Sequence, residues 1–321
     1  MNCCIADDGR VRIVRRDIPV AGDGDVVIKV YSTALNRADL MQRAGKYPPP
    51  PGATDILGLE CSGEIVSTGS NCKFQIGDKV MALCEGGSYA EYCLVRDTQV
   101  MRIPVSLEPA AGIPETWLTS YQLIHLIAKV SEDDSILVHA GASGIGCAVI
   151  QLAKLSNVRN IIVTASCDKK LEFCKELGAT HGFNYKTEDW ASGVLQVTGG
   201  VGCNVILDPI GMPYAQDNCR AISLDGRWIL YGLMGGASES MFPIFRDILM
   251  KRVHLIGTTL RSRDSQYKEH LVARLSSLFS KFEDQTLKVI VDRTFEGLSS
   301  ANDAQDYMGQ NKSIGKILIK I

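Results

Sequence analysis

The sequence lacks an excess of charge of either sign. Its 321 residues include 34 Lys and Arg against 36 Asp and Glu, which gives a formal net charge of −2 at pH 7. A chain this balanced has no general electrostatic attraction to nucleic acid or to an anionic membrane, so the composition favours neither partner. With 45% hydrophobic residues, the chain is long enough for two packed domains, and we expect small molecules as its partners.

The eleven cysteines include no Cys-x-x-Cys pair, the commonest sequence sign of a thiolate metal site. Cys61, Cys72, Cys84 and Cys93 are spaced too widely for a four-thiolate zinc site, so we interpret them as small buried hydrophobic residues. The five histidines also lack the spacing of metal ligands, and we expect each to be structural. The first eight residues contain no basic segment followed by an apolar core, so we expect no secretory signal and a cytoplasmic protein with reduced thiols.

Residues 135–153 carry no formal charge and are nearly long enough to span a membrane. Three glycines, and a serine and a histidine at mid-span, argue against a membrane helix. The apolar run from Ile136 to Ala140 instead predicts a strand, and Ile145, Val149 and Leu152 follow at helical spacing. A strand, a glycine turn and a helix in this order are typical of a dinucleotide site, where N–H groups at the helix start bind the pyrophosphate.

The sequence pattern changes twice along the chain. Short runs broken by Gly and Pro predict a mostly β region, with its clearest strands at 26–31, 62–66, 78–83 and 89–95. A helix is expected at 108–128, and strand and helix patterns then alternate. The six strands expected there are 136–139, 161–165, 182–185, 205–208, 228–231 and 254–258. The elements expected after them are a helix at 265–282, a strand at 289–295, a helix at 300–311 and a final strand at 316–321.

These patterns predict an α/β protein in which a doubly wound parallel sheet is inserted into a mostly β domain. We place the first part of the β domain at residues 1–114, the nucleotide-binding domain at 115–257, and the return to the β domain at 258–321. The cleft between the two domains is then the default ligand site.

The end of the second strand in such a sheet selects the cofactor, because the adenosine ribose lies there. An acidic residue at that point binds the ribose 2′-hydroxyl of NADH, whereas a cation with small polar neighbours suits the 2′-phosphate of NADPH. This strand ends at Ser166, and Lys169 and Lys170 follow. Asp168 is counter-evidence, but we expect it to cap the next helix. The sequence therefore favours NADPH, and Tyr185 either closes over the same phosphate or packs in the core.

Two further stretches are candidates for ligand contact. The run Tyr231-Gly232-Leu233-Met234-Gly235-Gly236 follows another strand, and its glycines let the backbone come close to a ligand. Tyr47 precedes four prolines, which hold an extended segment. This segment either packs on the surface or holds the tyrosine ring over a flat ligand.

Five motifs occur together in the chain: Asn36-Arg37-x-Asp39, Gly58-Leu59-Glu60, Ala140-Gly141-x-Ser143-Gly144-x-Gly146, Leu171-Glu172-Phe173-Cys174-Lys175-Glu176-Leu177-Gly178-Ala179 and Asn311-Lys312-x-Ile314-Gly315-Lys316. In combination they resemble the medium-chain dehydrogenase/reductase superfamily. More closely, the chain is similar, nearly from end to end, to the zinc-free quinone oxidoreductase branch, the zeta-crystallin group. This resemblance implies a Rossmann-type nucleotide domain inserted into a GroES-like domain.

The zinc-dependent alcohol dehydrogenases of this superfamily bind catalytic zinc through a Cys, the His of Gly-His-Glu and a further Cys or Asp. At the first two positions this chain has Asn36 and Leu59, so the comparison implies no catalytic zinc. Without a Lewis acid to stabilise an alkoxide, alcohol oxidation is disfavoured. A quinone or an enone needs only a hydride and a proton, because its oxyanion is delocalised.

The resemblance also implies roles for individual residues. Asn36, Tyr47 and Trp117 are expected around the nicotinamide and the substrate as the catalytic residues. The NADPH-binding residues that it implies are Tyr47, Gly141, Ser143, Gly144, Ile145, Gly146, Ser166, Lys170, Tyr185, Gly232, Leu233, Met234 and Gly235. We expect Arg37 and Asp39 to form an internal ion pair. No residue is an evident general acid, so proximity and orientation are expected to supply most of the rate.

The sequence thus favours an NADPH-dependent quinone or enone reductase, with two alternatives open. An enoyl-thioester reductase needs a basic entrance and a tyrosine proton donor, for which Lys46 and Tyr47 are available. A non-catalytic NADPH-binding protein of the lens-crystallin or RNA-binding kind is the other alternative, although the charge balance does not favour RNA. We also expect a homodimer formed through the nucleotide domain, with residues 253–260 as a candidate edge strand.

Overall fold

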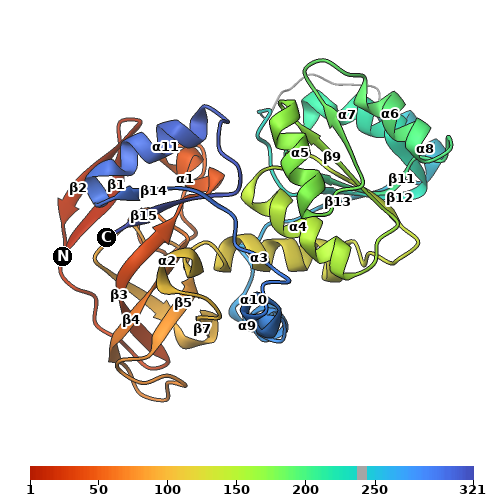
Figure 1. Cartoon of the computed structure of the whole chain (residues 1–321). Coiled ribbons are helices and arrows are strands. Elements are labelled where there is room, and N and C mark those ends of the chain that lie inside the picture. Colours follow the sequence, from red (N-terminus) through yellow and green to blue (C-terminus); the bar gives the residue numbers. More distant parts are fainter. Residues whose placement is uncertain (237–243) are drawn as a thin grey trace. The chain divides into compact units, whose positions relative to one another are not determined.

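The computed structural model describes residues 1–236 and 244–321, and the chain divides into two compact units (Figure 1). The first unit contains Met1–Leu118 and Leu260–Ile321, and the second contains Thr119–Thr259. The second unit is therefore an insertion in the first. The divisions follow residues 118 and 259, whereas the sequence-based boundaries follow residues 114 and 257.

The first unit is built on a seven-stranded sheet. In spatial order its strands are β14 (Val291–Glu296), β15 (Lys316–Lys320), β3 (Asp25–Ala34), β4 (Glu60–Thr68), β5 (Lys79–Leu83) and β7 (Val100–Arg102), and β6 (Tyr92–Arg96) pairs with β3 beside this path. The β14–β15 pair is parallel and the other pairs are antiparallel. The last strand of the chain thus returns to the first half of the unit, where Leu318 pairs with Ala34.

Two details of this unit differ from the sequence-based expectation. Strands β1 (Asn2–Asp7) and β2 (Arg10–Arg15) form a separate hairpin, which is not among the strands that we named from the sequence. The strand expected to begin at Tyr89 begins at Tyr92, because the backbone of Tyr89 pairs elsewhere: its N–H donates to Leu57 O at 2.9 Å, and its carbonyl accepts from Cys4 N at 2.8 Å.

The helices of the first unit are shorter than expected. Those that begin in it are α1 (Arg37–Arg43), α2 (Leu107–Ala110), α3 (Pro114–Tyr121), α9 (Ser265–Ser276), α10 (Phe279–Glu283) and α11 (Ala301–Gly309). The single helix expected at 108–128 is wrong. It is divided into α2, α3 and a π-helical turn at Gln122–Ile127, because Pro114 has no N–H to continue the α2 hydrogen bonds.

The helix expected at 265–282 is also divided. It begins as expected after Asp264, whose carboxylate accepts a hydrogen bond from Tyr267 N at 2.7 Å. It stops after Ser276, where the Ser277 hydroxyl donates to Arg274 O at 2.7 Å. A serine hydroxyl that bonds the backbone in this way competes with continuation of the helix.

The second unit contains the expected six-stranded parallel sheet. Its spatial order is β10 (His181–Asn184), β9 (Asn160–Ala165), β8 (Ser135–Val138), β11 (Cys203–Asp208), β12 (Ile222–Leu230) and β13 (His254–Gly257). All five strand pairs are parallel, so the α/β Rossmann-type fold is confirmed. The chain direction along the sheet reverses between β8 and β11, which is where doubly wound sheets bind their ligands.

Helices cover both faces of this sheet (Figure 1). One face packs on α4 (Gly144–Leu155) and α5 (Asp168–Leu177), and the other on α6 (Trp190–Val197), α7 (Ala215–Ala221) and α8 (Ile244–Lys251). Alternate residues of the central strands serve the two cores, as Ile136 and Leu137 do in β8. A strand buried on both faces must be apolar throughout, which is why the sequence predicted these strands well.

The uncharged segment 135–153 forms β8, the glycine turn and most of α4. Across the described residues, no helix has both the length and the apolar character needed to cross a membrane.

Candidate functional site

The glycine turn lies at the carboxyl end of β8 and leads directly into α4. Ser143 is the N-cap of α4, and its hydroxyl accepts a hydrogen bond from Gly146 N at 3.0 Å. A side chain at Gly146 would collide with the carbonyl oxygens of Ala140 and Gly141. The glycine is therefore required by the close approach of the helix to the turn, as in dinucleotide folds. The N-terminal N–H groups of a twelve-residue helix are available for an anionic group here.

The candidate adenosine-phosphate residues follow the next two strands of the same sheet. Ser166 comes directly after β9, and Tyr185 comes directly after β10. Because β8, β9 and β10 are parallel neighbours, these residues and the glycine turn share the carboxyl edge of the sheet. Lys170 lies on α5, the helix that follows Ser166. The Tyr185 ring also packs edge-on against Tyr214, with ring centroids 6.2 Å apart.

Asp168 does not cap α5, contrary to the expectation. Cys167 is the N-cap residue, and its extended backbone, with φ −168° and ψ 161°, keeps the chain out of the helix until Asp168. Asp168 is exposed in the first helical turn, where the helix dipole favours a negative charge.

The second glycine-rich loop, Gly232 to Gly235, follows β12 at the same edge. Its backbone pairs with the loop after β11: Met234 N donates to Pro209 O at 2.8 Å, and Gly235 N donates to Ile210 O at 3.0 Å. A side chain at Gly235 would collide with the Pro213 ring. Packing between two protein loops thus explains this glycine without a ligand, whereas the side chains of Leu233 and Met234 are about 40% exposed.

A buried polar network, which we did not predict from the sequence, joins the strand ends beneath these loops. His139 Nδ1 lies 2.9 Å from Thr164 Oγ1, and His139 Nε2 lies 2.8 Å from Asn218 Oδ1. Asn218 Nδ2 donates to Asp208 Oδ2 at 3.0 Å, and so does Trp228 Nε1. The other Asp208 oxygen accepts from the backbone N–H groups of residues 210 and 211. The network therefore fixes the loops that follow β8 and β11.

The network also fixes the protonation of His139. Because the Asn218 amide donates to Asp208, its Oδ1 accepts a hydrogen bond from His139 Nε2–H, and His139 Nδ1 is left to accept a hydrogen bond from the Thr164 hydroxyl. Burial lowers the pKa of His139 below its usual value. The neutral ring packs edge-on against Trp190 and Tyr214, so the expected structural role of this histidine fits its surroundings.

In the first unit, a buried ammonium group lies beside the predicted catalytic Asn36. Lys316 Nζ donates to Leu35 O at 2.7 Å and to Asn36 Oδ1 at 2.8 Å, and it lies 2.7 Å from Glu60 Oε1. Asn36 Nδ2 also donates to Glu60 Oε1, at 2.8 Å. All three ammonium protons are used, and both groups of the Asn36 amide are held in place. Glu60 and Lys316 open two strands of one sheet, and an isolated charge beside an apolar run was the sequence signal for them.

The expected ion pair between Arg37 and Asp39 is wrong. Asn36 and Asp39 form a capping box at the start of α1, in which Asn36 N donates to Asp39 Oδ2 at 2.8 Å. Arg37 follows the N-cap and donates to Asn311 Oδ1 at 2.6 Å instead. Burial raises the pKa of Asp39 to about 6.

Glu115 completes this cluster at the first turn of α3. Its backbone N–H donates to Glu60 Oε2 at 2.8 Å. Burial and the neighbouring Glu60 carboxylate raise the pKa of Glu115 to about 8. The partly buried Glu115 carboxyl therefore holds a proton in most molecules at neutral pH, a feature that the sequence did not reveal.

Tyr47 lies against a buried arginine that the sequence analysis did not single out. Arg261 Cζ is 5.4 Å from the centroid of the Tyr47 ring, within cation–π range. The guanidinium donates to Gln42 Oε1 at 2.9 Å and twice to Glu85 O, at 3.0 and 2.6 Å. Burial raises the pKa of the Tyr47 phenol, and the Arg261 charge opposes that shift. Tyr47 is thus a protonated hydroxyl on a ring held by a fixed cation.

Trp117, the third predicted catalytic residue, is buried in α3. Its ring packs edge-on against Phe282, with centroids 4.6 Å apart. This contact is sufficient to explain the tryptophan, so a role in substrate contact stays a prediction.

The residues at the zinc positions do not fit a zinc ion. Leu59 is buried and has no donor atom, and the Asn36 oxygen is already bonded to the Lys316 ammonium. Zinc in proteins takes Cys, His or carboxylate ligands. Asn36 and Leu59 therefore do not suit a catalytic zinc ion.

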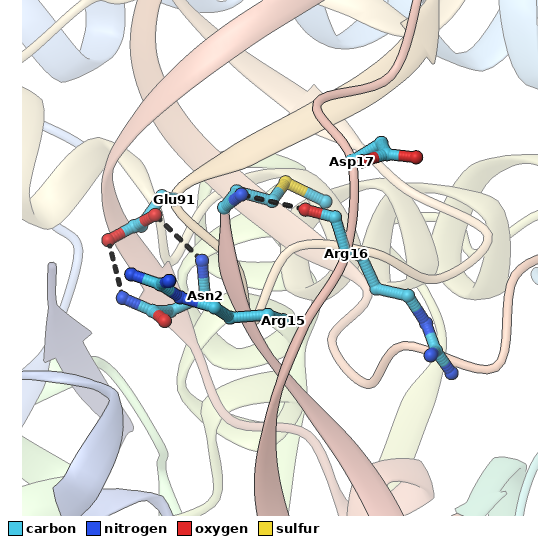
Figure 2. A pocket seen from close by; sticks show the side chains of 6 residues that line it. Asn2, Arg15, Arg16, Asp17 and Glu91 are labelled. Carbon is cyan, nitrogen blue, oxygen red and sulfur yellow. Dashed lines mark hydrogen bonds between the residues drawn. The ribbon is translucent and has the colours of Figure 1, made fainter.

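A polar surface hollow lies elsewhere in the first unit (Figure 2). It is lined by Met1, Asn2, Arg15, Arg16, Asp17 and Glu91. Glu91 accepts hydrogen bonds from Asn2 N at 2.7 Å and Asn2 Nδ2 at 3.0 Å, and Met1 N donates to Arg16 O at 2.7 Å. None of the predicted site residues lines this hollow, and we assign it no role.

Comparison with known families identifies both parts of the fold. Residues 22–105 match the model described as "Alcohol dehydrogenase GroES-like domain", and residues 144–277 match "Zinc-binding dehydrogenase". The first match falls in the mostly β unit and confirms the GroES-like expectation. The second begins at the first residue of α4.

Several curated proteins are similar over nearly the whole chain. "Synaptic vesicle membrane protein VAT-1 homolog" of Danio rerio is 28% identical over 95% of this chain, which spans 66% of that protein. "Quinone oxidoreductase-like protein 2 homolog" of Nematostella vectensis is 29% identical over 93% of this chain and 82% of its own length. "Prostaglandin reductase-3" of Mus musculus is 28% identical over 96% of this chain and 85% of its own length.

Solved structures share the fold of the entire chain. A mycobacterial protein complexed with NADPH is 25% identical, with a TM-score of 0.89 over 100% of this chain and 99% of that one. Quinone oxidoreductase of Escherichia coli, also complexed with NADPH, is 23% identical, with a TM-score of 0.88 over the same shares. The second likeness is evidence for the fold alone.

Proposed function

Because the chain belongs to the medium-chain dehydrogenase/reductase superfamily, we propose that it reduces quinones or related electron-poor enones with NADPH and without catalytic zinc. The single observation that carries this proposal is the Lys316–Asn36–Glu60 cluster. A buried ammonium group supplies the positive charge beside Glu60, at the place where zinc-dependent relatives need ligands for a metal. An acceptor that needs no Lewis acid is the chemistry that such a site supports.

The second unit supplies the proposed cofactor site. NADPH, when bound, supplies the hydride. In this proposal the turn Gly141, Ser143, Gly144, Ile145 and Gly146 holds the pyrophosphate through N–H groups at the start of α4. Ser166, Lys170 and Tyr185 hold the 2′-phosphate, and residues Gly232, Leu233, Met234 and Gly235 border the nicotinamide.

Preference for NADPH over NADH rests on the side chains at the end of β9. Ser166 is small and polar, and Lys170 offers a positive charge one turn into α5. The acidic Asp168 is exposed in the first turn of that helix. Asp168 therefore does not stand at the end of β9, at Ala165, where an acid would bind the ribose 2′-hydroxyl of NADH. Its position supports the choice of NADPH.

The first unit supplies the proposed catalytic residues Asn36, Tyr47 and Trp117. Tyr47 orients a flat acceptor because its ring is held by Arg261. The Tyr47 hydroxyl donates a hydrogen bond to the oxygen on which negative charge develops. Solvent supplies the proton that neutralises this oxygen after the hydride has been transferred. Orientation of the two reactants supplies most of the rate.

The test measures binding and turnover with the purified full-length protein. We expect NADPH binding, oxidation of NADPH with a small ortho-quinone, and little turnover with a crotonyl thioester. Faster turnover of the thioester would instead make the protein an enoyl-thioester reductase. NADPH binding without turnover of either compound would favour a non-catalytic role. Activity that a chelator abolishes and zinc restores would overturn the zinc-free proposal.

We also propose a homodimer in the cytoplasm, formed along β13. This strand lies at one end of the six-stranded sheet, and Leu255 is 45% exposed on it. An exposed strand edge is a template for pairing with a second chain. Light scattering should give a dimer for the native protein, and Leu255→Pro should give a monomer, because Thr258 N bonds to β12 and the alternating N–H of Leu255 therefore faces the free edge, where proline removes the donor.

A further inference from the structure

Three buried cysteines come together in the seven-stranded sheet of the first unit. Cys61 lies on β4, Cys84 directly follows β5 and Cys93 lies on β6. Cys84 Sγ is 3.9 Å from Cys61 Sγ and 3.7 Å from Cys93 Sγ, and all three sulfur atoms lie within 4.8 Å of one another. Our expectation that they are buried is confirmed. Their sequence spacing did not reveal this cluster, because strand pairing brings distant residues together.

The separations suit a single soft ion bound to three thiolates. Sulfur atoms about 2.3 Å from a common centre lie roughly 3.3 Å apart at bond angles near 90°, as at a three-coordinate ion with a lone pair, and roughly 3.8 Å apart at tetrahedral angles. Two of the three separations, 3.7 and 3.9 Å, lie close to the upper value. Binding therefore requires the three sulfur atoms to move together by less than about 1.5 Å for each pair, which side-chain rotation of Cys61 or Cys93 would supply. Thiolates select soft ions over hard ones.

The surroundings of the thiols determine which soft ion fits. The remaining members of this core cluster are Val26, Ile28, Val30, Ile65, Val80, Ala82, Val95 and Val100. A net charge in an apolar core is costly. Three thiolates leave a net charge of −2 around Cu⁺ and −1 around Zn²⁺, whereas a trivalent ion leaves none.

We propose that Cys61, Cys84 and Cys93 form a binding site for trivalent arsenic, supplied as arsenous acid. Three arsenic–sulfur bonds form and three arsenic–oxygen bonds break. Each thiol proton leaves with one hydroxide as water, so three waters are released and neither arsenic nor sulfur changes oxidation state. The site therefore needs no co-reactant, and it is independent of the proposed hydride transfer.

This exchange releases water from each cysteine because the three cysteines are neutral thiols before arsenous acid binds. Burial among apolar side chains favours the neutral thiols over thiolates. Cys84 Sγ donates to Ala82 O at 3.7 Å, and Cys93 Sγ donates to Gly86 O at 3.9 Å. Arsenous acid is itself uncharged at neutral pH, so it enters an apolar region without the cost of a charge.

Because the site is buried, binding must follow local opening of β4 to β6. The protein is reduced with a phosphine, since a dithiol reductant would compete for arsenic, and is then incubated with excess arsenite. Incubation continues until the amide protons of these strands have exchanged with solvent, which shows that the site has opened. Free arsenite is removed, and the arsenic that remains per chain is measured.

We expect one arsenic per chain, with three sulfur neighbours and no oxygen neighbour in the X-ray absorption spectrum. Cys61→Ala, Cys84→Ala and Cys93→Ala should each abolish this three-sulfur signal. The matched controls are Cys72→Ala, a half-buried thiol at the same core, and Cys203→Ala, a buried thiol of the second unit; both should retain it. Circular dichroism shows whether each variant folds. If a variant does not fold, the X-ray absorption spectrum of the native protein still tests the site.

Three outcomes would overturn the proposal. One is the absence of arsenic after complete exchange. Another is an arsenic atom with two sulfur and one oxygen neighbours, which would mean a dithiol site. The last is equal retention by the native protein and by folded variants that lack Cys61, Cys84 or Cys93.

Discussion

Lys316 Nζ lies 2.7 Å from Glu60 Oε1, and neither side chain is more than 4% exposed. The lysine comes from the segment that follows the inserted unit, and the glutamate comes from the segment that precedes it. The pair thus joins the two halves of the first unit at the proposed catalytic residue Asn36, to which both are bonded.

Lys316→Met should destabilise the protein strongly, because it leaves the Glu60 carboxylate buried without its counter-charge. Removal of one partner of a buried pair typically costs about 3–5 kcal/mol, and urea unfolding measures the change. The exposed Lys312→Met should change stability little. Lys316→Met combined with Glu60→Gln should recover part of the loss, and a double variant no more stable than Lys316→Met alone would show that charge is not the cause.

Glu115→Gln should make the protein less sensitive to alkaline pH. The folded pKa of Glu115 is about 8, above its usual value of 4.5, so the folded state keeps a proton that the unfolded chain loses between these values. Native stability therefore falls as the pH rises from about 4.5 to 8. Gln resembles the protonated acid and removes this dependence.

The stability of Glu115→Gln relative to the native protein should thus rise by about 1–3 kcal/mol between pH 5 and pH 9. A pKa shift from 4.5 to about 8, at roughly 1.4 kcal/mol for each pKa unit, gives a total of about 5 kcal/mol. We expect less than this total because Glu115 is only partly buried. Unfolding measured across the pH range tests it, with the exposed Glu64→Gln on β4 as the control. Parallel curves for the native protein and Glu115→Gln would contradict the raised pKa.

His139→Gln should have the opposite pH dependence. Burial lowers the folded pKa of His139, so its contribution to stability is complete above the unfolded pKa of about 6.5 and is lost as the pH falls below that value. At pH 7 the variant should be less stable by about 1–3 kcal/mol, since two buried hydrogen bonds are disturbed. The difference should shrink towards pH 5, whereas the exposed His181→Gln should show no such trend. A constant difference from pH 7 to pH 5 would be inconsistent with a neutral buried imidazole.

The sequence predicted the second unit better than the first because of how its strands are buried. Strands covered on both faces, such as β8 and β9, are continuous apolar runs between helices. In the first unit, β2 carries exposed arginines at positions 10, 12 and 15, and its partner β1 contains two cysteines and an aspartate. Neither resembles an apolar strand, so the hairpin was not expected.

The polar groups of the site were less predictable, because their partners are distant in the chain. Lys316 and Glu60, His139 and Asn218, and the three thiols meet only after strands have paired. The glycine turn was predictable because its function depends on neighbours within six residues. Ser143 and Gly146, which bond to each other, illustrate that local rule.

Lys170→Ala should weaken NADPH binding far more than NADH binding if Lys170 contacts the 2′-phosphate. A hydrogen bond to a charged group is worth about 1.5–3 kcal/mol, which corresponds to roughly a 10- to 100-fold rise in the Kd for NADPH. The matched control is Lys169→Ala, since Lys169 is the exposed neighbour on the same helical turn. Titration of cofactor fluorescence measures both constants. Equal losses for NADH and NADPH would exclude Lys170 from the phosphate site, and a loss confined to Lys169→Ala would transfer the role to that residue.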